Sequence, residues 1–193
     1  MAQLLGSPAR FPARSGPTMS QPPGTDGCGS RTMSGVPFTH ETAVPAAPHD
    51  LITTLTGEAF VRAALADLGA DVREVTVQPG RTTAVYSVPT RGIPQAFASF
   101  VGDRVQVTDV RTWTAEGDGA TGTVLVTTTL FGRDVRLEAR RSITPTATGS
   151  TITSSGRSSV DAPFVGRKAE GGVDELAGVV LRKEAGTLAR QLG

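Results

Sequence analysis

The sequence predicts an α+β fold in which a curved antiparallel sheet of about six or seven strands wraps around one long C-terminal helix. Three observations lead to this prediction. Residues 72–160 contain period-two runs rich in Val and Thr, separated by short breaks. Two short stretches before them contain apolar residues at helical spacing. The C-terminal stretch repeats apolar side chains at three- and four-residue steps.

Residues 1–35 differ in composition from the rest of the chain. They contain six glycines and five prolines, and their apolar residues follow no period. Burial that would offset the entropy of ordering this segment is therefore missing. We expect a disordered tail at 1–35 and one folded domain at 36–193. Internal methionines leave open whether translation starts at Met1, Met19 or Met33.

The domain is expected to begin with one strand and two short helices. Residues 36–44 form the strand, which the prolines that follow it end. Helices are expected at 50–56 and 57–68, the second because its apolar residues fall at four-residue spacing on one face. Gly69 then provides a left-handed helix cap.

The middle of the chain is expected to be a meander of antiparallel strands. The connections between the strands are short, which favours antiparallel neighbours. The expected strands are 72–77, 82–88, 104–113, 122–131, 133–143 and 150–160.

One strand breaks its own alternation. Val105 and Val107 are in phase, whereas Val110 falls on the opposite parity. A β-bulge near Thr108 or Asp109 would reconcile them, so we predict a bulge there.

The last helix is expected to begin near Asp161 and Pro163 and to run for about 28 residues to the C-terminus, roughly 42 Å. It contains glycines at 166, 171, 172, 178 and 186, each of which costs about 1 kcal/mol relative to alanine. Two explanations stay open. The glycines allow close packing on the sheet or a kink, or they leave room for a ligand.

Composition excludes several classes of function. Lys and Arg number 19 against 18 Asp and Glu, so the charge gives no drive toward nucleic acid or an anionic membrane. Cys28 is the sole cysteine, and the two histidines stand in no metal-binding motif. No apolar run is long enough for a membrane-spanning helix. We expect a cytoplasmic protein with no cofactor, no metal, no bound nucleic acid and no integral membrane segment.

Pocket walls are better candidates for function than catalytic groups. Nine aromatic residues in the chain fill a core sparingly, which favours unfilled space. Each candidate also fits plain core packing. Arg140 and Arg141 are adjacent on a strand, so one faces inward and needs a partner such as Glu138 or a ligand carboxylate. The candidate ligand-binding residues are Tyr86, Phe97, Phe100, Trp113, Thr127, Thr129, Phe131, Arg141, Val173, Ala177, Val180 and Leu181.

The order of elements is that of the helix-grip fold, and four short segments indicate a particular family with this fold. They are EAFVRAALADLG at 58–69, IPQAF at 93–97, VRTW at 110–113 and APFVGRKAE at 162–170. They resemble an uncharacterised actinobacterial family of the START-like superfamily, which includes polyketide cyclases and plant pathogenesis-related proteins. The resemblance covers about 36–192. It implies a cavity between sheet and final helix for lipids, sterols, polyketides or other apolar molecules, and no particular reaction.

Three hypotheses for function follow. The first is binding or carriage of a hydrophobic small molecule in that cavity. The second is a non-catalytic interaction or structural domain with a filled core. The third is a cyclase-like or hydrolase-like enzyme that uses Tyr86 or an inward arginine as a proton or charge partner. An apolar cavity distinguishes the first hypothesis from the second.

Overall fold

The computed structural model describes residues 37–90, 103–130, 132–160 and 166–192, with side chains of the last segment from 172 on. All of them belong to the second of the two units into which the chain divides, Thr32–Gly193. The predicted tail and the expected helix start near Asp161 lie outside the described residues. The elements are β1 (Phe38–Val44), α1 (Pro48–Thr56), α2 (Glu58–Asp67), β2 (Asp71–Gln78), β3 (Arg81–Pro89), β4 (Arg104–Glu116), β5 (Gly119–Leu130), β6 (Arg133–Thr146), β7 (Gly149–Val160) and α4 (Gly166–Leu192).

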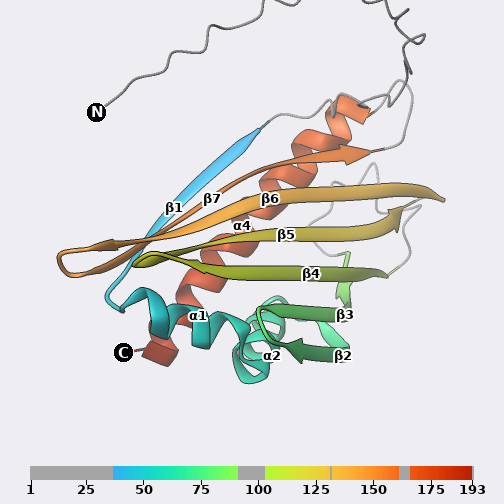
Figure 1. Cartoon of the computed structure of the whole chain (residues 1–193). Helices are drawn as coiled ribbons and strands as arrows, with labels where there is room; N and C mark the ends of the chain where they lie inside the picture. Colours follow the sequence, from blue (N-terminus) through green and yellow to red (C-terminus); the bar gives the residue numbers. More distant parts are fainter. Residues whose placement is uncertain (1–36, 91–102, 131, 161–165, 193) are drawn as a thin grey trace, which may run out of the picture. The chain divides into compact units, whose positions relative to one another are not determined.

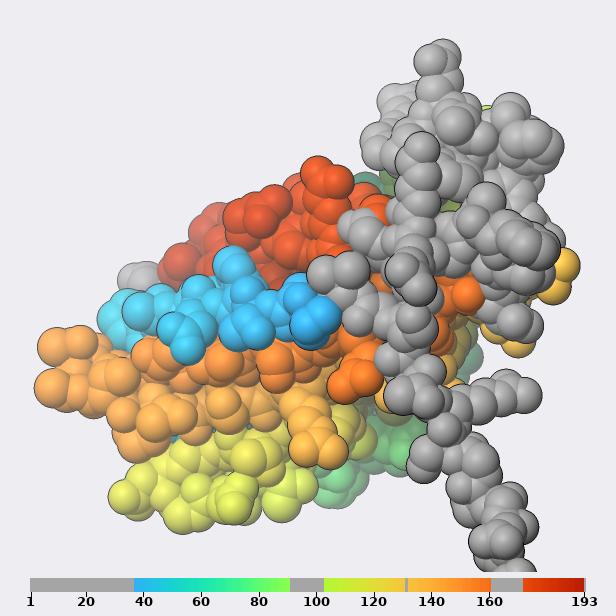
Figure 2. Space-filling model, turned by 90° about the horizontal axis from the view of Figure 1, so that it is seen from above, coloured from blue at the N-terminus to red at the C-terminus, as the bar shows by residue number. Residues whose placement is uncertain are grey.

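The strands form a single antiparallel sheet in the order β1-β7-β6-β5-β4-β3-β2. Strands β2 to β7 follow one another as the predicted meander, and β1, the first strand of the chain, pairs with β7 at the other edge of this meander. Helix α4 crosses one face of the sheet, with its C-terminal end beside α1 and α2 (Figure 1). In Figure 2 the red surface of α4 borders the blue surface of β1. The predicted α+β architecture and order of elements are therefore confirmed.

Alternation along the strands separates an inner face, toward α4, from an outer face. In β4, Val105 and Val107 are buried and Gln106 is exposed. The two short helices add their apolar stripes to the same interior, because their spacing places those residues on one side. Large buried side chains of this core are Leu51, Leu55, Phe60, Leu65, Ile143, Ile152 and Leu188.

Strand β4 is regular where a bulge was predicted. Its pairing with both β3 and β5 continues without a shift through Asp109, so the predicted bulge is wrong. The alternation is intact, but Asp109 and Arg111 occupy inner-face positions and Val110 faces outward. Apolar residues lose their phase here because the inner face is charged at this point.

Gly122 makes room for Trp113. The two residues are paired across β4 and β5, and a Cβ atom at Gly122 would lie 2.7 Å from Cε3 of Trp113 and 2.5 Å from the carbonyl oxygen of Thr112. The indole therefore lies close over the backbone of β5. It extends toward Arg141 on β6, whose Cζ is 5.3 Å from the ring centroid.

The glycines of α4 are not explained by close packing. A Cβ atom added at Gly172 would meet nothing within 4 Å, and at Gly178 it would meet only the side chain of Arg182 at 3.4 Å. At Gly186 the nearest atom is in the side chain of Arg190, at 3.6 Å. The packing explanation is wrong for these three glycines, and nothing in the structure accounts for them.

We expect opposite effects from two glycine-to-alanine substitutions. Gly122→Ala should lower the free energy of unfolding by about 1–3 kcal/mol, because the methyl group overlaps Trp113 and the neighbouring strand. Gly172→Ala should raise it by up to about 1 kcal/mol, because the space is open and alanine favours the helix. Urea denaturation followed by circular dichroism measures both, and unchanged stability in Gly122→Ala would contradict the close contact.

Candidate functional site

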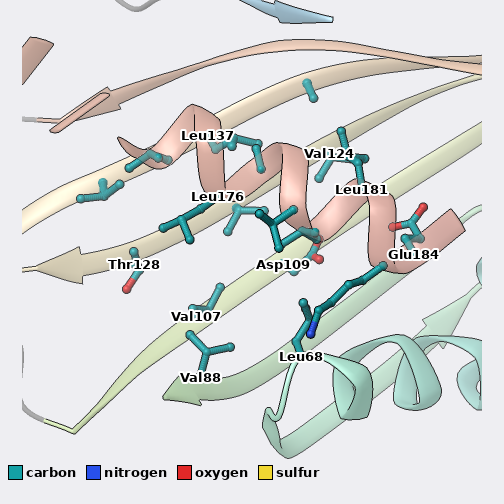
Figure 3. Close-up of a pocket in the computed structure, with 18 of the residues that line it drawn as sticks. Leu68, Val88, Val107, Asp109, Val124, Thr128, Leu137, Leu176, Leu181 and Glu184 are labelled. Atoms are coloured by element: carbon teal, nitrogen blue, oxygen red, sulfur yellow. The ribbon is translucent and has the colours of Figure 1, made fainter. Parts of the chain in front are cut away.

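A cavity of about 370 Å³ lies between the inner face of the sheet and α4 (Figure 3). Leu176 lines it and is nevertheless 44% exposed, which places an opening of the cavity beside this residue. Most of the lining is apolar: Phe38, Leu68, Val88, Pro89, Val105, Val107, Val124, Val126, Leu130, Val135, Leu137, Ala139, Val173, Leu176, Ala177, Val179, Val180 and Leu181. The polar lining residues are Tyr86, Asp109, Arg111, Thr128, Arg141, Ser154, Lys183 and Glu184.

Four charged side chains of this lining form one buried cluster, which we call the charge cluster: Asp109, Arg111, Arg141 and Glu184. Arg111 donates from Nη2 to Oδ2 of Asp109 at 2.8 Å and from Nη1 to Oε2 of Glu184 at 2.7 Å. Nη2 of Arg141 lies 2.6 Å from Oε1 of Glu184, an ion pair by distance that is not aligned as a hydrogen bond. The two positive and two negative charges cancel.

Burial and neighbouring charges shift the pKa of Glu184 and Arg111 in the charge cluster and of the tyrosine beside it. Burial by itself raises the pKa of Glu184, but Arg141 and Arg111 outweigh burial and lower it to about 2. Desolvation opposes the charge of Arg111, yet Asp109 and Glu184 hold its pKa well above the ordinary value. Burial, with the charge of Asp109 adding to it, raises the pKa of Tyr86, so the phenol keeps its proton.

A second polar contact holds α4 against α2. Thr187 donates to Oδ2 of Asp67 at 2.5 Å, and Arg190 pairs with the same oxygen. Lys183 donates from Nζ to the carbonyl oxygen of Asp67 at 2.6 Å. Hydrogen bonds from Thr187 and Arg190 lower the pKa of Asp67. These contacts fix the C-terminal end of α4 against α2, next to the residues of the helix that line the cavity.

The candidate residues predicted from the sequence divide into four groups, the last of which is the pair Thr127 and Thr129. Trp113 is buried beside Arg141 and does not line the cavity. Phe97, Phe100 and Phe131 lie outside the described residues. The cavity lining includes Tyr86, Arg141, Val173, Ala177, Val180 and Leu181.

Thr127 and Thr129 of β5, predicted to bind the ligand, lie on the face of the sheet that points away from the cavity. Thr128 lines it, whereas Thr127 and Thr129 alternate with the lining residues and lie on the outer face. Val124 and Val126 on the same strand also line the cavity. Val124, Val126 and Thr128 are all even-numbered, so the alternation along the strand predicts that Thr128 lies on the same face as the two valines.

The partner of the inward arginine is on the helix. Arg141 faces inward and is buried, and Arg140 is exposed. Glu184 pairs with Arg141 across the cavity end, and Glu138 pairs with Arg136 instead. Glu138, one of the two kinds of partner that the sequence left open, is therefore not the partner of Arg141.

Sequence reasoning missed three members of the charge cluster: Asp109, Arg111 and Glu184. The break in apolar phase along β4 is a signal for the first two, but a bulge would produce the same break. Glu184 falls between Leu181 and Leu188 in the apolar stripe of α4, and a carboxylate in such a stripe needs a buried cation.

The described residues hold no cluster of three His, Cys, Asp or Glu side chains suited to a metal ion. The carboxylates of the charge cluster are already paired with arginines. In the part of the chain that the structure describes, no helix is long and apolar enough to cross a membrane.

Removing Glu184 should destabilise the fold strongly. In Glu184→Ala two buried arginines lose their shared carboxylate, and loss of one partner of a buried ion pair costs about 3–5 kcal/mol. Glu175→Ala, an exposed position on the same helix, is the matched control and should change the free energy of unfolding by less than about 0.5 kcal/mol. Chemical denaturation measures both, and equal effects would contradict the structural role of Glu184.

The Glu184 carboxylate should also make the free energy of unfolding fall as the pH is lowered. Because its pKa falls from 4.5 to about 2 on folding, its contribution is fully present above pH 4.5 and is lost as the pH falls toward 2. We expect the free energy of unfolding to fall less steeply over this range in Glu184→Gln than in the unsubstituted protein. Asp67 adds its own acid-sensitive contribution to both proteins, so the difference between the two denaturation series reports Glu184. Parallel curves would count against the assignment.

Solved structures share this architecture at low sequence identity. A conserved protein from Geobacillus kaustophilus is 14% identical with a TM-score of 0.51, over 79% of this chain and 93% of that chain. The truncated norcoclaurine synthase from Thalictrum flavum is 12% identical with a TM-score of 0.52, over 83% and 94% of the two chains. A START superfamily protein from Mycobacterium smegmatis is 16% identical with a TM-score of 0.46, over 82% and 98%.

A search of curated proteins finds no match to this sequence. The sequence profile of the family described as protein of unknown function (DUF2505) matches residues 39–192, which run from the second residue of β1 to the end of α4. The chain belongs to the DUF2505 family.

Proposed function

We propose that this protein binds and carries a hydrophobic small molecule, such as a lipid or a polyketide, in the cavity between the sheet and α4. The observation that carries the proposal is the cavity itself, of about 370 Å³ and with a mainly apolar lining. Ligand sites in proteins have this character: apolar walls with a few placed polar groups. The likeness in fold to START-like proteins, expected from the sequence, agrees with the same role.

The cavity favours a carrier over an interaction domain with a filled core. Water inside it meets side chains of Val, Leu and Ala that offer no hydrogen bonds. Its volume corresponds to about a dozen water molecules at liquid density. Replacing such water by an apolar molecule is favourable, since apolar surface is removed from water on both sides.

An enzymatic role has less support from the same residues. Tyr86 keeps its proton because burial raises its pKa, so it does not serve as a base near neutral pH. Arg141 is engaged with Glu184, with Ser154 at 3.1 Å and with the ring of Trp113. Similarity in fold to norcoclaurine synthase transfers no reaction.

Filling the cavity should weaken binding of an apolar probe. N-phenyl-1-naphthylamine, a neutral fluorophore, should bind the unsubstituted protein with saturable enhancement of its emission. Val126→Trp places an indole in the cavity and should weaken binding by about tenfold or more. Leu125→Trp is the matched control, because the adjacent residue of β5 faces outward, and it should bind as the unsubstituted protein does.

Two results would oppose the proposal. One is the absence of probe binding to the unsubstituted protein, together with native mass spectra that contain no co-purified small molecule. The other is equal binding by Val126→Trp and Leu125→Trp, which would place the probe elsewhere on the molecule.

A further inference from the structure

The polar groups of the cavity are concentrated around the charge cluster. Figure 3 shows Glu184 toward one end of the lining and Val88 and Leu137 toward the other. Tyr86 lies near enough to Asp109, Arg111 and Glu184 for their charges to affect its pKa. An apolar molecule in this cavity therefore meets charged groups and the phenol of Tyr86 toward one end, and the hydroxyl of Thr128 toward the other.

The remaining polar lining residues are already engaged. Thr128 donates to the carbonyl oxygen of Gln106 at 2.6 Å, and Ser154 accepts from Nε of Arg141. Lys183 is exposed and donates to Asp67 at the surface. Recognition of a ligand's polar group thus depends on the charge cluster and Tyr86.

The charge cluster offers no unbalanced positive charge to an anion. Both arginines face carboxylates at 2.6–2.8 Å. A ligand carboxylate would bring a net negative charge into a buried site that already holds Asp109 and Glu184, and burying an uncompensated charge is far more costly than burying a hydrogen-bonded neutral group.

A neutral oxygen fits the same place. The Tyr86 hydroxyl makes no hydrogen bond to another residue within the described part of the chain. Oε1 of Glu184 has a charged neighbour but no aligned donor. A ligand hydroxyl can both donate and accept, and a carbonyl can accept from the phenol.

On the basis of the function proposed above, we infer that the ligand is an uncharged amphipath: an apolar body with one terminal hydroxyl or carbonyl group. Its apolar body lies along the wall formed by β4 to β6 and α4, and its oxygen pairs with Tyr86 beside the charge cluster. Molecules with the same apolar body and an ionised carboxylate are disfavoured.

Three ten-carbon probes test this inference by displacement of N-phenyl-1-naphthylamine. They are 1-decanol, 1-chlorodecane and, at neutral pH, ionised decanoate. Tyr86→Phe removes only the hydroxyl and keeps the ring. It should weaken 1-decanol about two- to tenfold, the effect of one hydrogen bond, and leave 1-chlorodecane unchanged. An equal affinity of 1-decanol for both proteins would overturn the inference.

The charge argument has its own test, because decanoate is intrinsically more soluble in water than 1-decanol. The quantity to compare is therefore the affinity of each probe for the variant relative to its affinity for the unsubstituted protein. Glu184→Gln leaves the charge cluster with a net positive charge, and it should strengthen decanoate binding by about tenfold or more while 1-decanol does not gain. Asp109→Asn changes the charge of the cluster by the same amount, and it replaces Glu184→Gln in this test if Glu184→Gln does not fold.

The outcomes separate this inference from the proposed function. If none of the three probes displaces the fluorophore, or the fluorophore itself does not bind, the function fails. If 1-chlorodecane binds and decanoate binds the unsubstituted protein as tightly as 1-decanol, only the inference fails. Loss of that decanoate binding in Lys183→Met would then assign the anion to Lys183, and this too would overturn it.

Discussion

The contact between Glu184 and two arginines of the sheet determines how the rest of this structure is arranged. Arg111 and Arg141 come from β4 and β6, and Glu184 comes from the helix that covers them. A buried carboxylate is tolerated only where cations compensate it, so the helix has one favourable register on the sheet. This register places Val173, Ala177 and Val180 of the helix over the strands.

The same contact explains how a chain with few bulky side chains maintains an open interior. Apolar packing alone would draw the helix toward the sheet until the space closed, because dispersion and burial both favour contact. The ion pairs of Glu184 and, one turn further along α4, the contact of Thr187 with Asp67 of α2 limit that approach. The cavity is then a consequence of where the polar contacts lie.

The fold could be predicted from periodicity because each element carries its own local pattern. Helix α2 has an apolar stripe, the strands alternate, and Gly69 adopts the predicted left-handed conformation with φ of 69°. The cavity site could be predicted less well, since its key contacts join residues far apart in the sequence. Nothing local in residues 138–141 reveals that the partner of Arg141 is 43 positions away on the helix. At β4 the sequence did carry the signal, but a charged inner face and a bulge produce the same break in apolar phase.

The position of Trp113 gives the protein a built-in optical reporter. It is the sole tryptophan of the chain. Its ring lies beside the guanidinium of Arg141, and Arg141 in turn lines the cavity. A molecule that reaches the charge cluster perturbs that guanidinium and, through it, the electrostatic environment of the indole. We therefore expect occupancy of the interior to change the protein's own fluorescence, without any label.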